Sequence, residues 1–137
     1  FGESLKSILT SFIYTDVSNE NVQFFTFNQW FDESLFNEKS FQNLIFPGID
    51  LKNFNRFNEK YYKKFKEPAI EISILAYDAL GLIYFMWSQN KSNFKIDKIT
   101  TKEGFKGLQG KFKIKNNLSH QNLKIYQIID KKFIMVN

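Results

Sequence analysis

The feature that most limits how this chain can fold is a nearly continuous apolar segment, residues 69–87. Only Glu71, Ser73 and Asp78 interrupt it. A membrane-spanning helix needs roughly 20 consecutive apolar residues, and a carboxylate at mid-membrane costs several kcal/mol. Because the two carboxylates leave too short an uninterrupted stretch, the segment predicts a buried helix packed on a sheet.

Helical and strand-like segments alternate up to the end of this apolar segment. Apolar residues at helical spacing predict a helix over residues 3–14, and an aromatic stripe predicts a second over 53–66, capped by Asn53. Short β-prone runs at 22–27 and 42–46 predict strands. This alternation is typical of the α/β class with a mainly parallel sheet.

The rest of the chain has a different pattern. Residues 99–105 predict a short helix, and the glycines of the segment 104–110 predict a turn. This segment precedes a strand-like run at 111–115, whereas a phosphate-binding glycine loop follows a strand and opens a helix. Strand-like runs at 123–129 and 133–136 flank a tight turn, so the chain is expected to end in a β-hairpin.

Composition weighs against several classes of function. The chain has no cysteine and one histidine, His120, which excludes a thiolate nucleophile and a cysteine- or histidine-rich metal site. The net charge is +5, but the lysines alternate with acidic residues and Arg56 is the only arginine. Because arginine is the preferred residue for bidentate phosphate contacts, we expect no nucleic-acid partner. No cofactor and no metal are expected either.

Two carboxylates of the apolar segment are the remaining candidates for catalysis. Glu71 and Asp78 are two helical turns apart and could share a face. In the alternative that we favour, Glu71 lies in the first turn, where it suits the helix dipole, and a neighbouring group satisfies Asp78. We therefore expect no catalytic residue and no enzyme; an α/β enzyme using one of these carboxylates is the weaker hypothesis.

Polar and aromatic residues follow the two predicted strands. Asn28, Gln29 and Trp30 come directly after the first strand, and Pro47 with Gly48 after the second. Ligands of open α/β sheets bind just past the carboxyl ends of strands. An indole and two amides could hold a small molecule by stacking and hydrogen bonding, although Trp30 could equally cap the core.

Several stretches, taken in order, resemble a known family. They are residues 29–30, 44–48, a helix with Phe57, Tyr61 and Tyr62 that ends in Phe65 and Pro68, the Leu-Ala-Tyr-Asp-Ala-Leu run at 75–80, and the Gly-Phe-Lys-Gly-Leu-Gln-Gly-Lys-Phe run at 104–112. Over roughly residues 22–136 the chain is similar to the C-terminal lobe of type I periplasmic binding proteins of the branched-chain amino-acid receptor type. It looks particularly like the penicillin-binding-protein activators that share this fold.

The resemblance implies a fold of two Rossmann-like lobes that trap a ligand between them. We therefore expect residues 1–137 to form a single C-terminal lobe, a three-layer α/β structure with a mainly parallel sheet plus a C-terminal β-hairpin. The N-terminal lobe is expected to lie elsewhere in a longer protein. The start at Phe1 without methionine or signal peptide also favours a piece of a longer protein.

The resemblance also implies a function. The chain is expected to be a non-enzymatic periplasmic receptor domain, the solute-binding component of an amino-acid-type ABC transporter, which passes a small polar solute to a membrane permease. The alternative is a lipid-anchored activator of a peptidoglycan synthase; amides at 28–29, where amino-acid receptors usually have a carboxylate, favour it. Asn28, Gln29, Trp30, Pro47 and Tyr77 are the residues expected to bind the ligand.

Overall fold

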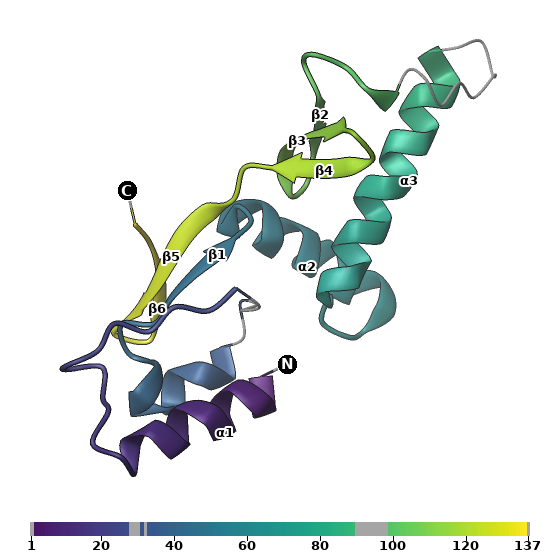
Figure 1. The fold of residues 1–137 in the computed structure, drawn as a ribbon. Helices are drawn as coiled ribbons and strands as arrows, with labels where there is room; N and C mark the ends of the chain where they lie inside the picture. The colour runs from purple at the N-terminus through teal and green to yellow at the C-terminus, as the bar shows by residue number, and fades with distance from the viewer. Residues whose placement is uncertain (1, 28–30, 32, 90–98, 137) are drawn as a thin grey trace. The chain divides into compact units, whose positions relative to one another are not determined.

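The computed structural model describes residues 2–27, 31, 33–89 and 99–136 (Figure 1). The chain divides into two compact units. Unit 1 comprises Phe1–Gly48 and Lys124–Asn137, and unit 2 comprises Ile49–Leu123. Each unit has its own three-stranded sheet, and no described sheet is shared between the two. That residues 1–137 form a single lobe stays a prediction.

Unit 1 combines short helices with a small sheet. Its helical elements are α1 (Gly2–Ile13), which agrees with the predicted 3–14, and the 3-10 helices η1 (Glu33–Asn37) and η2 (Lys39–Phe41). Its strands are β1 (Ile45–Gly48), β5 (Lys124–Ile129) and β6 (Lys132–Val136), in the order β1-β5-β6. The predicted C-terminal hairpin is confirmed: Asp130 and Lys131, both with positive φ, connect β5 to β6.

The core of unit 1 is aromatic. Phe46 is completely buried, and its ring lies 5.8 Å from that of Phe31, 5.9 Å from Tyr126 and 5.8 Å from Phe133, centroid to centroid. Gly48 ends β1 where a Cβ atom would lie 3.0 Å from the Phe31 ring and 3.1 Å from Tyr126. The contacts of Phe46 with Phe31 and Phe133 are edge-to-face and that with Tyr126 is stacked, and both kinds add to the stabilisation that burial alone gives.

The predicted mainly parallel sheet is not confirmed. The ladders between the described strands are antiparallel, and parallel pairing is limited to an isolated bridge between Phe25 and Ile45. The predicted strand at 22–27 contributes only this bridge. The Thr26 amide donates to the Ile45 carbonyl, and the Ile45 amide donates to the Phe24 carbonyl. Tight turns connect several of the other strands, and strands joined by such turns must run antiparallel.

Unit 2 begins with α2 (Leu51–Phe65), two residues earlier than predicted. The N-cap is Asp50, whose carboxylate accepts a hydrogen bond from the Asn53 amide at 3.0 Å, so the prediction that Asn53 caps the helix is wrong. Asn53 lies in the first turn, and its side-chain amide donates to the carbonyl of Leu108 at 3.3 Å. Both residues are common caps, and the register of the aromatic stripe does not distinguish them.

Asp50→Ala is expected to lower the free energy of unfolding of unit 2 by about 1 kcal/mol, because the Asn53 amide loses its acceptor. Urea unfolding measures this loss, and amide exchange at Asn53 should accelerate with it. Lys52→Ala, an exposed substitution in the same turn, is the control and should change stability by less than about 0.5 kcal/mol. Equal losses in the two variants would show that the cap contributes nothing of its own.

The remaining elements of unit 2 are α3 (Glu71–Gln89) and the strands β2 (Phe105–Gly107), β3 (Gly110–Lys115) and β4 (Leu118–Gln121), in the order β2-β3-β4. α3 lies against β2 (Figure 1). The predicted helix at 99–105 is wrong within the described residues, since turn residues and the start of β2 occupy its C-terminal half. The predicted glycine turn is present between β2 and β3.

The apolar segment forms a helix as predicted, but its predicted burial is only partly observed. Along α3, Ile74 and Met86 are buried and Asp78 and Leu82 half-buried, which defines one stripe at four-residue spacing. Most other large apolar side chains of the helix are exposed in this chain. Within the described residues, no helix is both long and apolar enough to span a lipid bilayer.

Candidate functional site

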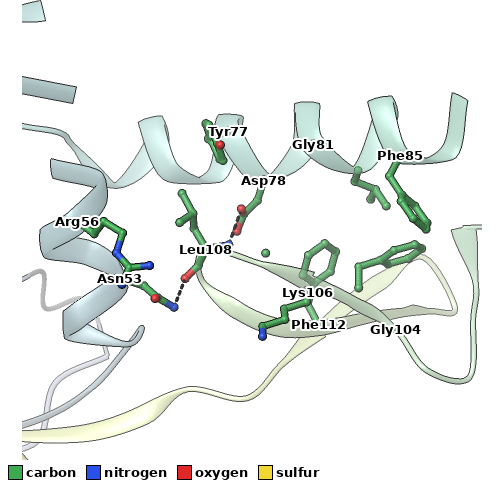
Figure 2. Close-up of a pocket in the computed structure, with 13 residues that line it drawn as sticks. Asn53, Arg56, Tyr77, Asp78, Gly81, Phe85, Gly104, Lys106, Leu108 and Phe112 are labelled. Atoms are coloured by element: carbon green, nitrogen blue, oxygen red, sulfur yellow. Dashed lines mark hydrogen bonds between the residues drawn. The ribbon is translucent and has the colours of Figure 1, made fainter. Parts of the chain in front are cut away.

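Unit 2 contains a pocket of about 690 Å³ formed by α2, α3 and the β2–β3 hairpin (Figure 2). The wall is largely apolar, and polar side chains from α2 and α3 lie at one end. The apolar side chains are those of Leu82, Phe85, Phe105, Leu108 and Phe112, and the polar ones are those of Asn53, Arg56, Tyr77, Asp78 and Lys106. Pockets of this size and character are typical of sites for small molecules.

Asp78 holds the β2–β3 turn against α3. Its Oδ1 accepts a hydrogen bond from the Leu108 amide at 2.7 Å, and its Oδ2 accepts one from the Gln109 amide at 3.0 Å (Figure 2). The interpretation that a neighbour satisfies Asp78 is therefore confirmed. Because Asn53 also binds the carbonyl of Leu108, both polar groups of the Leu108 backbone are fixed by side chains from helices.

Gly107 makes this contact possible. A Cβ atom at this position would collide with the carboxylate of Asp78, lying 2.6 Å from its Cγ atom. The backbone φ of Gly107 is not positive, so the position does not require the conformational freedom of glycine. Glycine is needed here because a side chain would occupy the space of the Asp78 carboxylate. The Ala-Tyr-Asp-Ala run and the glycine segment are thus two halves of one structural contact.

The aromatic wall is set by the register of the hairpin. Phe105 and Phe112 are opposite each other in the β2–β3 ladder, with ring centroids 5.7 Å apart, and Phe85 of α3 meets Phe105 edge-on at 6.0 Å. The sequence could have revealed this pair, because a two-residue turn between Gly107 and Gly110 places Phe105 opposite Phe112.

The polar end of the pocket carries positive charge. Arg56 and Lys106 are exposed and line the pocket, whereas both oxygens of the Asp78 carboxylate accept from the backbone. Tyr77 stands at the same end, 58% exposed, with its ring edge-on to Phe57 at 5.5 Å. The pocket thus combines an apolar wall with a cationic, hydrogen-bonding end.

The structure does not bring the predicted ligand-binding residues together in one described site. Asn28, Gln29 and Trp30 lie outside the described residues. Pro47 lies in β1 of unit 1, half-buried and opposite Ile125, whereas Tyr77 lines the pocket of unit 2. Sequence reasoning did not single out the aromatic wall or Arg56 as contacts.

The remaining candidates for chemistry are few. His120 lies exposed in β4 opposite Lys113. In the part of the chain that the structure describes, no group of three or more histidine, cysteine or acidic side chains could hold a metal ion. The side chain of Glu71 is not among those described.

Comparison with known proteins shows that the fold of this chain is similar to part of a solved structure. No protein-family model matches the sequence, and no curated protein matches it. Among solved structures, that of a protein assigned as a branched-chain amino acid ABC transporter, from Rhodospirillum rubrum, matches with a TM-score of 0.72 at 9% sequence identity. The match covers 85% of this chain and 37% of that chain. This chain therefore has a mixed helix–sheet fold similar to part of that protein.

Proposed function

We propose that this chain belongs to a non-enzymatic solute-binding protein of the type I periplasmic kind, which serves an ABC transporter. The fold likeness to a protein assigned to such a transporter supports this proposal. The observation that carries it furthest is the pocket of unit 2, where Tyr77, a residue expected to contact ligand, stands beside an aromatic wall. The periplasm and a membrane permease are the compartment and partner that follow from this proposal.

The character of the pocket suggests what the solute is like. An aromatic wall suits an apolar side chain, and Arg56 with Asn53 offers charge and hydrogen bonds to a carboxylate. The solute that we propose is an amino acid or a similar small molecule. Asp78 binds backbone amides with both oxygens, which supports a binding role over a catalytic one. No observation favours the activator of a peptidoglycan synthase.

A thermal-shift screen against amino acids, small carboxylates and muropeptides tests the proposal. A ligand at about a thousand times its dissociation constant adds about 4 kcal/mol to the stability of the protein that binds it, which raises the melting temperature by several degrees. We expect such a shift with an amino acid or small carboxylate. No shift across the panel would contradict the proposal, and a response to muropeptides alone would favour the activator.

Tyr77→Ala is expected to weaken binding of that solute by about tenfold or more, since the ring forms part of the pocket wall. Tyr84→Ala is the matched control, because Tyr84 is an exposed tyrosine of the same helix that does not line the pocket. Calorimetric titration of both variants measures the effect. An equal loss of affinity in the two would place the binding site elsewhere.

A further inference from the structure

Gly81 lies in the middle of α3 and lines the pocket of unit 2, between Asp78 and Phe85 along the helix (Figure 2). The positions of α3 that line the pocket, among them Asp78, Gly81, Leu82 and Phe85, recur at spacings of three and four. Such positions share one side of a helix. Gly81 therefore belongs to the side of α3 that faces the pocket, and it contributes no side chain to that wall.

Glycine is a poor choice for the interior of a helix. It loses more conformational freedom on folding than any other residue, so alanine at the same position is normally more stable. In the part of the chain that the structure describes, no heavy atom beyond its chain neighbours and its own stretch of helix lies within 4 Å of a Cβ atom built at Gly81. The described packing therefore leaves room for alanine here and does not explain the glycine.

Gly104 and Gly107 also line the pocket, but the structure explains both of them. Gly107 leaves room for the Asp78 carboxylate. At Gly104 the backbone φ is +71°, and a Cβ atom would collide with the carbonyl oxygen of Phe112. Gly81 differs from these two because the space that its missing side chain leaves is part of the pocket.

We infer that Gly81 is a specificity-determining residue of this pocket, because it leaves the space in which the apolar group of the solute lies against α3. This inference rests on the proposed function and narrows the class of solute to amino acids with a bulky apolar side chain. Phe85 and Phe112 of the aromatic wall would contact that side chain, and Arg56 at the polar end would hold the carboxylate.

Gly81→Ala tests the inference, because stability and binding are expected to change in opposite directions. Alanine should raise the melting temperature by about 2–5 °C, since it favours the helix. Calorimetric titration measures the affinity for L-phenylalanine, L-leucine and L-alanine. The affinity for the first two should fall about tenfold or more, because the added methyl group takes space that their side chains need, whereas that for L-alanine should change less than about twofold.

Ala76→Gly is the matched control, because Ala76 is an exposed residue of α3 that does not line the pocket. It should lower the melting temperature by a similar amount and leave all three affinities unchanged. A stabilised Gly81→Ala variant that binds L-phenylalanine and L-leucine as tightly as the parent chain would overturn the inference and leave the proposed function intact. A lower melting temperature of Gly81→Ala would also overturn it, since packing within the chain would then require the glycine. If the parent chain binds none of the three solutes, the proposed function fails and the inference fails with it.

Discussion

Phe46→Ala is expected to lower the free energy of unfolding of unit 1 by about 3–5 kcal/mol. The side chain is completely buried, and its ring contacts those of Phe31, Tyr126 and Phe133. The substitution removes the apolar surface that the core buries and leaves a cavity that the aromatic neighbours can fill only in part. Urea unfolding followed by circular dichroism measures the loss.

Amide exchange shows whether the loss lies in unit 1. The Ile128 amide donates to the Leu44 carbonyl at 3.1 Å, in the sheet that carries Phe46, and its exchange should accelerate strongly in the variant. Phe27→Ala is the control, because Phe27 is 87% exposed, and its loss should stay below about 0.5 kcal/mol. A loss below 1 kcal/mol for Phe46→Ala would show that the aromatic core of unit 1 is not packed as described.

Asp78→Ala is expected to cost about 2–4 kcal/mol of the stability of unit 2. The substitution leaves the amides of Leu108 and Gln109 without their acceptor, and hydrogen bonds to a charged group contribute about 1.5–3 kcal/mol each before exposure reduces them. Amide exchange at these two residues should accelerate well beyond that of the β3–β4 ladder. Glu59→Ala, an exposed carboxylate of α2, is the control and should be nearly neutral.

Gly107 supplies a second test of the same contact. Gly107→Ala should cost about 1–3 kcal/mol in the parent chain, because the added methyl group collides with the Asp78 carboxylate. In the Asp78→Ala background the same change should cost much less, since the carboxylate is gone. The two substitutions are therefore expected to be non-additive. Equal costs of Gly107→Ala in both backgrounds would contradict the contact described for Asp78.

Local patterns predicted the elements better than their assembly. The spacing of Leu5, Leu9 and Phe12 was sufficient to predict α1, and the polar turn at 130–132 was sufficient to predict the final hairpin. The α/β alternation suggested parallel pairing, but strand direction depends on contacts between distant segments. Of the predicted parallel pairing, the described residues contain a single bridge, between Phe25 and Ile45.

The candidate site was harder to predict because it depends on packing between elements. The resemblance predicts Tyr77 as a ligand contact together with residues that follow the predicted strands, yet Tyr77 lines a pocket formed by two helices and a hairpin. In the sequence, Arg56 has the pattern of an isolated surface charge. No residue near it along the chain indicates that it lines the same pocket as Phe112. The two motifs of the resemblance, at 75–80 and 104–112, did contain the main contact of the site, from Asp78 to the amides of Leu108 and Gln109.

The most direct test of the central claim, that the pocket of unit 2 binds a small amphipathic solute, is a nuclear magnetic resonance titration of the ¹⁵N-labelled chain with L-leucine and L-phenylalanine. Saturable shifts are predicted for the amides of Phe105, Leu108 and Phe112 and for those around Tyr77. The same titration of Tyr77→Ala should require about tenfold more solute. Spectra unchanged by both solutes, or shifts confined to unit 1, would contradict the claim.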